Sequence, residues 1–166
     1  MAMLAGPPLA ETEIHDFWMQ QAIALAAQAG AAEEVPVGAV IVSAENELIA
    51  TGENRRQRDH DPTAHAEIIA LRRAGQRLGT WYLTGCRLYV TLEPCPMCAG
   101  AIIQARIHTL IYGASDPKAG AIDSVLQLPQ SPAVFHRLQV IRGVQAAACR
   151  QQLQTWFRQH RQKEQQ

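Results

Sequence analysis

The alternation of short apolar segments with longer helical patterns most constrains the fold of this 166-residue chain. Runs of β-branched and apolar residues that are typical of strands occur at residues 37–43, 47–52, 86–92, 107–113 and 137–141. Apolar residues recur at helical spacing in residues 11–30, 64–78, 95–106 and from 144 to the C-terminus. Because strands that alternate with helices usually form a sheet covered on both faces, we predict a three-layer α/β/α domain with a mixed sheet of about five strands.

The length favours a single domain over residues 1–166, since domains usually contain roughly 100–200 residues. Gly6-Pro7-Pro8 predicts a flexible tail over residues 1–10, and the Gln-rich end predicts a frayed tail over residues 160–166. No stretch reaches the ~18 apolar residues of a membrane span. The first ten residues also lack the basic residues of a signal peptide. We therefore expect a cytoplasmic protein without a membrane partner.

The formal net charge of zero conceals an uneven distribution of charge. Residues 1–50 contain seven acidic residues and neither Lys nor Arg, whereas residues 51–166 contain 15 basic against 8 acidic residues. Thirteen of the basic residues are arginines, which suit bidentate contacts with phosphate and stacking on bases. The neutral total therefore does not exclude a nucleic-acid partner.

Two short motifs carry the chemistry. His65-Ala66-Glu67 begins one predicted helix, and Pro94-Cys95-Pro96-Met97-Cys98 begins another. Cys95 and Cys98 are three residues apart, so their sulfurs share one face of a first helical turn, where the helix start favours thiolates. With His65 they form a Cys2His set for zinc. Three protein ligands that leave a fourth position for water are typical of a catalytic zinc site.

Two other uses of the cysteines are possible. A structural zinc site would need a fourth protein ligand, and no other Cys or His has a paired spacing with these three. A redox Cys-x-x-Cys pair would leave His65 and Glu67 without a role. Glu67 is placed roughly 200° around the helix from His65, so we expect it beside the metal as a proton carrier. A glutamate in a first turn can also be a surface residue favoured by the helix dipole.

These motifs resemble those of the tRNA-specific adenosine deaminases, which belong to the cytidine-deaminase-like zinc deaminases. The resemblance extends over about residues 12–163. It is carried by blocks at residues 35–40, 61–67, 91–102 and 112–114, together with residues 148–149 and 156–158 near the end. It implies a cytidine-deaminase-like α/β/α fold and a homodimer. It also implies one zinc ion per subunit, bound by His65, Cys95 and Cys98.

The resemblance further implies hydrolytic deamination of adenosine to inosine at the wobble position of a tRNA anticodon stem-loop. In this reaction zinc makes water acidic enough to supply hydroxide, which attacks C6 of adenine. Glu67 carries the proton to N1 and then to the leaving amine, and ammonia departs. The implied substrate contacts are Val37, Asn54, Ala66, Asp116, Lys118, Phe157 and Arg158.

The residues themselves leave alternatives for several of these contacts. Asn54 follows a strand and can equally be a turn residue. The C-terminal helix interleaves arginines with Trp156 and Phe157, which suits phosphate neutralisation and stacking on bases. We expect one of these aromatic residues to pack on the core and the other to face RNA. Glu93 is expected to be a structural hydrogen-bond partner rather than a catalytic acid.

Two other functions remain open. Small-molecule deaminases of the guanine or cytosine type share the metal motifs, so those motifs cannot exclude them, although the basic and aromatic C-terminal helix favours tRNA. A non-catalytic, zinc-stabilised RNA-binding scaffold is the third possibility. Glu67 argues against it, because a scaffold does not need a proton carrier.

Overall fold

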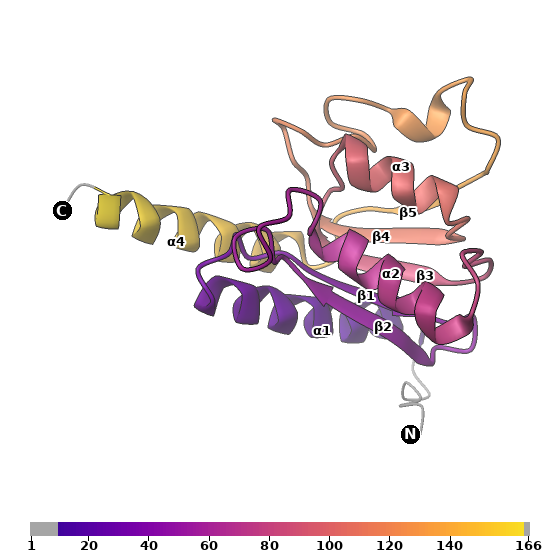
Figure 1. Ribbon diagram of the computed structural model, residues 1–166, viewed down its shortest axis with the longest axis horizontal. Helices are drawn as coiled ribbons and strands as arrows, with labels where there is room; N and C mark the ends of the chain where they lie inside the picture. The colour runs from indigo at the N-terminus through magenta and orange to yellow at the C-terminus, as the bar shows by residue number, and fades with distance from the viewer. Residues whose placement is uncertain (1–9, 165–166) are drawn as a thin grey trace.

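A five-stranded mixed sheet lies between two pairs of helices in a computed structural model that describes residues 10–164 (Figure 1). The strands are β1 (Gly38–Val42), β2 (Leu48–Glu53), β3 (Arg87–Leu92), β4 (Thr109–Ala114) and β5 (Gln139–Ile141). Their order across the sheet is β2-β1-β3-β4-β5. β1 is antiparallel to β2 and to β3, whereas β3, β4 and β5 are parallel. The predicted α/β class and the mixed five-stranded sheet are confirmed.

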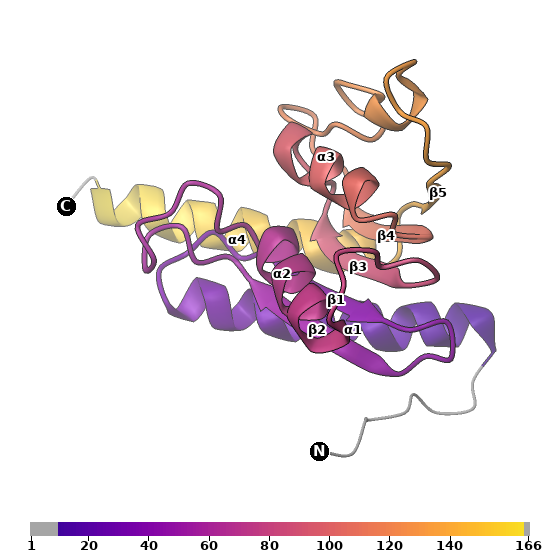
Figure 2. The ribbon, with the colours of Figure 1, turned by 45° about the vertical axis from the view of Figure 1, so that its right-hand side comes forward.

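The helices are α1 (Glu11–Ala31), α2 (Ala66–Leu78), α3 (Pro96–Gln104) and α4 (Ala146–Glu164), with a short 3-10 turn, η1, at Leu128–Gln130. α2 and α3 cover one face of the sheet, and α1 and α4 cover the other (Figures 1 and 2). Each helix begins and ends within a few residues of the predicted bounds.

The strands β1, β3 and β4 are buried on both faces along most of their length. Ala39 and Ile41 of β1 pack in the core beneath α2 and α3, while Val40 and Val42 pack in the core beneath α1. Strands buried on both sides read as continuous apolar runs, not as alternating ones. This explains why the sequence shows short apolar segments at these positions.

Two glycines allow the helices to approach the sheet closely. A Cβ at Gly38 would collide with the carbonyl oxygen of Ala22 in α1, and one at Gly52 would collide with that of Ala66 in α2. The contact at Gly52 brings the beginning of α2 directly against β2. The His65-Ala66-Glu67 segment is thereby fixed to the sheet.

Both predicted terminal tails fall partly outside the described residues, the C-terminal one at residues 165–166. Nine residues of the predicted N-terminal tail, 1–9, lie outside the described residues. Residues 160–164 of the predicted C-terminal tail are part of α4, where His160 and Lys163 lie 2.7 and 3.0 Å from the Glu33 carboxylate. Within residues 10–164, none of the helices combines the length and the apolar character that crossing a bilayer demands.

Candidate active site

The three predicted metal ligands meet where the beginnings of two helices converge. His65 is the N-cap residue of α2, Cys95 is the N-cap residue of α3, and Cys98 lies in the first turn of α3. Pro96 occupies the start of α3, where a missing N–H costs little. His65 Nδ1 lies 3.6 Å from Cys95 Sγ and 3.5 Å from Cys98 Sγ. All three ligand atoms lie within 4.8 Å of one another.

These distances fit one zinc ion. Zinc bonds of about 2.3 Å to sulfur and about 2.0–2.1 Å to nitrogen, at a tetrahedral angle, separate the sulfur from the nitrogen by roughly 3.5–3.6 Å. The separations between His65 and the two cysteines match that value. Among the described residues, this is the one group of Cys, His and carboxylate side chains close enough together to hold a metal ion. The donor set therefore fits a three-ligand zinc site with one position left for water or substrate.

The protein prepares the ligands electrostatically. Hydrogen bonds from Cys98 and from His65 lower the pKa of the Cys95 thiol to about 4, so this sulfur is a thiolate at neutral pH. The hydrogen bond to Cys95, together with burial, raises the pKa of Cys98. Cys98 therefore has to release its proton when a metal binds, because the thiolate is the form that ligates zinc.

Glu67 lies one residue inside α2, and its side chain is only 4% exposed. Burial raises the pKa of Glu67 to about 7. A carboxyl group with a pKa near the working pH can both take up and release a proton, which is what a general acid–base requires. Its burial removes the interpretation of Glu67 as a solvent-exposed residue of the first turn.

A cavity of about 180 Å³ opens beside the metal ligands. Its lining includes four of the predicted substrate contacts, namely Val37, Asn54, Ala66 and Asp116. Asn54 is buried; its Nδ2 donates to Val35 O at 3.2 Å, and its Oδ1 accepts from the N–H of Arg56 at 3.3 Å. Asn54 therefore has two roles: it stabilises the loop that follows β2, and it lines the cavity.

Glu93 fixes the opposite wall of the cavity. Its buried carboxylate accepts hydrogen bonds from the backbone N–H groups of Asp116, Ile122, Asp123 and Ser124 at 2.8–3.2 Å, and from the Ser124 hydroxyl. Burial acts to raise the pKa of Glu93, but these hydrogen bonds outweigh it and lower the pKa. The carboxylate holds the segment after β4 against the Pro94-Cys95 turn, as expected of a structural partner.

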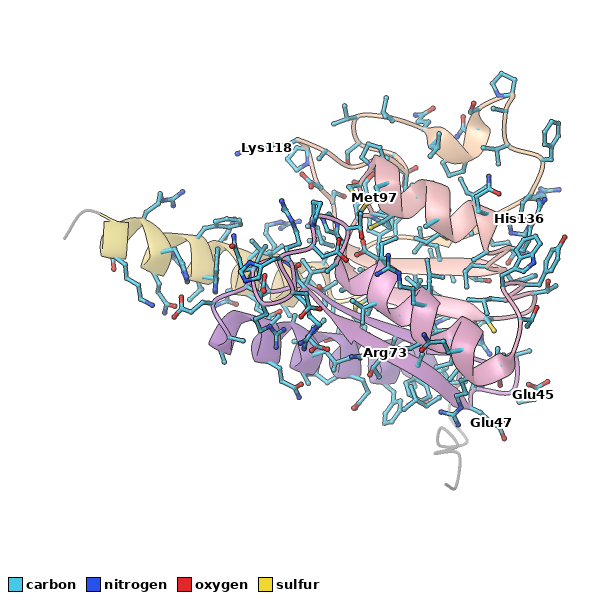
Figure 3. The ribbon with its side chains drawn as sticks, viewed as in Figure 1. Glu45, Glu47, Arg73, Met97, Lys118 and His136 are labelled. Atoms are coloured by element: carbon cyan, nitrogen blue, oxygen red, sulfur yellow. The ribbon has the colours of Figure 1, made fainter. Side chains whose placement is uncertain are left out.

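The remaining predicted contacts do not line the cavity. Lys118 projects from the turn after β4 (Figure 3), and its backbone N–H donates to the Asp116 carboxylate at 3.0 Å. Phe157 and Arg158 lie on α4, and the Phe157 side chain is 42% exposed. Trp156 instead packs against Gly30 at the end of α1 and stacks on His160, with ring centroids 3.6 Å apart. One aromatic residue of the pair faces inward and the other outward.

Sequence reasoning missed two residues around the cavity. Glu34 is 1% exposed, and its carboxylate accepts the N–H groups of Gln57 and Arg58 at 3.2 and 2.8 Å. It thereby clamps the loop that follows Asn54. Arg56 lines the cavity itself. Both residues stand in charged stretches that show no periodicity, so no pattern distinguished them from surface residues.

Comparison with known proteins assigns the class of this fold and site. Residues 12–114 match the family described as the cytidine and deoxycytidylate deaminase zinc-binding region, a stretch that includes the three predicted ligands and Glu67. A solved guanine deaminase from Nitrosomonas europaea superposes with a TM-score of 0.72 at 25% identity, covering 93% of this chain and 96% of that one. The chain is therefore a member of the zinc-dependent cytidine and deoxycytidylate deaminase family.

Other relatives narrow the assignment. A tRNA-specific adenosine deaminase from Haemophilus influenzae is 45% identical over 90% of this chain and 87% of its own length. A structure from a study of tRNA:A34 deaminases superposes with a TM-score of 0.80 at 43% identity, covering 82% of this chain and 98% of that one. Within the deaminases, this chain belongs to the tRNA-specific adenosine deaminase family.

Larger proteins also contain a related segment. Two Deinococcus proteins named tRNA(Ile)-lysidine synthase, from D. deserti and D. radiodurans, are 46% and 54% identical to this chain in the matched region. The chain spans only 28% and 19% of their respective lengths. Similar domains therefore occur both in proteins of about this size and as parts of longer chains.

Proposed function

We propose that this protein converts adenosine to inosine at the wobble position of a tRNA anticodon, with release of ammonia. The observation that carries the proposal is the buried Glu67 beside a Cys2His site of zinc dimensions. Zinc sites of this kind act on several bases and nucleosides. The similarity to tRNA-specific adenosine deaminases favours adenosine in tRNA as the substrate of this one.

The chain's own residues supply binding and proton transfer. Zinc held by His65, Cys95 and Cys98 would make a water molecule acidic enough to yield hydroxide near neutral pH. Glu67 takes the proton of that water, passes it to N1 of adenine, and later delivers a proton to the departing amine. One water is consumed and one ammonia is released, so the atoms of the hydrolysis balance. Burial of Glu67 keeps bulk solvent away from this proton path.

The size of the cavity supports a base as the group that enters it. Ligand pockets for whole small molecules usually enclose roughly 300–1,000 Å³. The cavity beside Glu67 measures about 180 Å³. A flipped-out base can enter such a space while its ribose and phosphates remain outside. Asn54, Val37 and Ala66 would contact that base.

The loop after β2, the turn after β4 and α4 carry basic groups that could bind the rest of the RNA. In Figures 1 and 2 the loop after β2 lies beside α4, and the C-terminal end of α4 extends beyond that loop and beyond the sheet. α4 presents Phe157 and Arg158 on its surface. Lys118 and Asp116 would meet the RNA from the turn after β4. Because a tRNA is the substrate, we propose a cytoplasmic location.

We also propose that the protein is a homodimer, with contacts through α2 and α3. An open apolar groove of about 800 Å³ runs between these helices. The exposed Trp81 lines this groove, and the exposed Tyr82 stacks on Trp81 with ring centroids 3.7 Å apart. Light scattering should give twice the chain mass for the wild type and the single chain mass for Trp81→Glu. A monomeric wild type at micromolar concentration would refute the dimer.

The decisive experiment is incubation with anticodon stem-loop hairpins, with inosine scored by nucleoside mass spectrometry. We expect inosine at the wobble position, and none when the adenosine is moved by one position. Free adenosine, guanine and cytosine are the controls. The rival function is guanine deamination, favoured by the similarity to the Nitrosomonas enzyme. Turnover of guanine or cytosine without turnover of the hairpin would establish that rival and overturn the proposal.

A further inference from the structure

Arg56 differs from the other arginines of its loop. Arg55 Nε lies 2.9 Å from the carboxylate of Asp59, and Arg58 NH2 lies 3.6 Å from that of Glu53. Arg56 is exposed, and within residues 10–164 no carboxylate is paired with its guanidinium. The loop therefore holds two arginines that stabilise the fold and one that is free to bind something else.

The backbone around this free guanidinium is fixed. The N–H of Arg56 donates to Asn54 Oδ1, and the two following N–H groups, of Gln57 and Arg58, donate to the buried carboxylate of Glu34. Just before Arg56, the N–H of Arg55 donates to Ala64 O at 2.9 Å, next to the ligand His65. Arg56 thus extends from a rigid loop that also positions the cavity wall and a metal ligand.

Arg56 is the single Lys or Arg among the residues that line the cavity. Three carboxyl groups line the cavity, and none of them forms an ion pair with Arg56. Glu67 is buried and serves in the proposed proton transfer, whereas Asp116 and Glu93 are engaged in hydrogen bonds. Asp116 Oδ1 accepts the N–H groups of Lys118 and Ala119 at 3.0 and 3.2 Å, and Glu93 is saturated by backbone donors. Neither carboxylate requires Arg56 as its partner, so the cationic charge beside the cavity is available to an anion of the substrate.

The cavity accommodates a base and excludes its phosphates, so those phosphates must lie at the opening. A guanidinium presents a planar fork of N–H donors that matches a phosphate in bidentate geometry. We propose that Arg56 binds a phosphate flanking the target adenosine and holds the RNA backbone at the opening while the base is inside. This inference rests on the proposed function, because it requires a polynucleotide substrate.

The contact would make Arg56 a determinant of substrate class. A free nucleobase or nucleoside has no flanking phosphate, so it would gain nothing from Arg56. An RNA hairpin would gain both affinity and the correct placement of its base. The guanidinium therefore favours nucleic acid over the small molecules that the same zinc chemistry could deaminate.

The test uses Arg56→Gln, with Arg87→Gln as the matched control. Arg87 opens β3 at the end of the strand remote from Cys95, and its guanidinium donates to Ala44 O at 2.8 Å. Hairpins carrying a single neutral methylphosphonate, either 5′ or 3′ of the target adenosine, remove one phosphate charge at a time. Zinc content and Tm are measured for each variant to verify that the site and the fold are intact.

The methylphosphonate and the Arg56→Gln substitution each lower kcat/KM. At one of the two methylphosphonate positions, 5′ or 3′ of the target adenosine, we expect these two losses not to add. The methylphosphonate should lower kcat/KM of the wild type and of Arg87→Gln about tenfold, but should leave Arg56→Gln unchanged, because that variant has already lost the contact. The slope of log Kd against log salt should become shallower by about 1 in Arg56→Gln. Arg56→Lys should restore that slope while recovering only part of kcat/KM.

Other outcomes would overturn the inference. If Arg56→Gln forms inosine as fast as the wild type, or if the losses multiply at both phosphates, Arg56 does not bind either phosphate. A wild type that forms no inosine from any hairpin would instead refute the proposed function itself. The two failures are therefore distinguishable in one set of reactions.

Discussion

The buried carboxylate of Glu34 accepts a hydrogen bond from the backbone N–H of Arg58 at 2.8 Å and lies 3.7 Å from the guanidinium of the same residue. Through this pair, the connection between α1 and β1 holds the loop that follows β2. The Arg58 guanidinium also donates to Asn54 O at 2.9 Å, so the clamp reaches a residue of the cavity wall. A carboxylate far from the metal in sequence thus organises one side of the site.

Glu34→Gln should loosen this side of the site without removing zinc. A glutamine offers a single carbonyl oxygen, so one of the two N–H groups that Glu34 now accepts would lose its buried partner, at a cost of about 1–3 kcal/mol. We expect KM for an anticodon hairpin to rise more than kcat falls, with the metal content unchanged. Glu45→Gln, at an exposed turn remote from the site, is the control (Figure 3). An unaltered KM and urea midpoint in Glu34→Gln would contradict the clamp.

Glu67→Gln should abolish turnover while leaving the metal bound. The substitution preserves size but removes the group that accepts and returns the proton, and general acid–base catalysis contributes about 10²–10⁴-fold. The expected result is a fall of kcat by at least about 10²-fold, with one zinc per chain by elemental analysis. Retention of near wild-type kcat would exclude Glu67 from proton transfer. Loss of zinc would instead make it a ligand or a ligand-positioning group.

The grouping of Cys95 with Cys98 was readily predicted from sequence because it depends on one helical turn, and the motif around His65 suggested the third member of the group that the structure brings together. Cys95 and Cys98 share a helical turn, and His65 caps another helix. Glu34 was not predictable in this way. Its partners are backbone N–H groups 23 and 24 residues away, and their positions depend on the path of a loop that has no periodic pattern. Sequence spacing identifies groups on one element, whereas the contacts that hold a loop emerge only once the chain is folded.

For the strands too, the positions were predictable from sequence but the order in the sheet was not. The strand patterns identified the positions of all five strands, most clearly for β1, β3 and β4, which are largely buried. Strand order was not predictable from those runs, because β1 lies between β2 and β3 through contacts distant in the chain. The same limit of sequence-based prediction applies to the neighbouring aromatic residues Trp156 and Phe157. The sequence suggested that one of them packs on the core and the other faces RNA, but only the close approach of Gly30 to Trp156 identifies which one packs inward.

Cys98→Ser should cost both zinc and stability. Metal binding requires the folded arrangement of ligands, so its free energy adds to that of folding. If the loss is about 3 kcal/mol, the Tm should fall by roughly 6–12 °C for a domain of this size. Chelation of wild-type protein should produce a similar fall, and chelation of Cys98→Ser should produce none.

Cys86→Ala provides the matched control for the ligand variant. Cys86 is buried like Cys98 but lies immediately before β3, outside the group of His65, Cys95 and Cys98. It should keep one zinc per chain and remain sensitive to chelation. If Cys86→Ala lost zinc, or if Cys98→Ser retained it, the assignment of the ligands would be wrong.

The ion pair of Asp123 with Arg142 predicts a pH-dependent contribution to stability. Arg142 Nε and NH2 donate to the two Asp123 oxygens at 2.7 and 2.6 Å, and the Tyr112 hydroxyl donates at 2.7 Å. The pKa of Asp123 is lowered below its usual 3.8 mainly by the Arg142 guanidinium and to a smaller extent by the Tyr112 hydroxyl. The stabilisation is therefore complete above the unfolded-state pKa and is lost as the pH falls through the lower pKa of the folded state.

Asp123→Asn isolates the charge, because the asparagine oxygen can still accept from Tyr112. Arg142 is about half exposed, so the difference in unfolding free energy between wild type and variant should be only about 0.5–1 kcal/mol at pH 7. Urea unfolding should show this difference unchanged down to about pH 5 and shrinking below pH 4. In an Arg142→Gln background, the same substitution should have little effect at any pH, since the partner charge is gone. A difference that persists to pH 3, or that is the same in both backgrounds, would mean that the pair does not supply this stability.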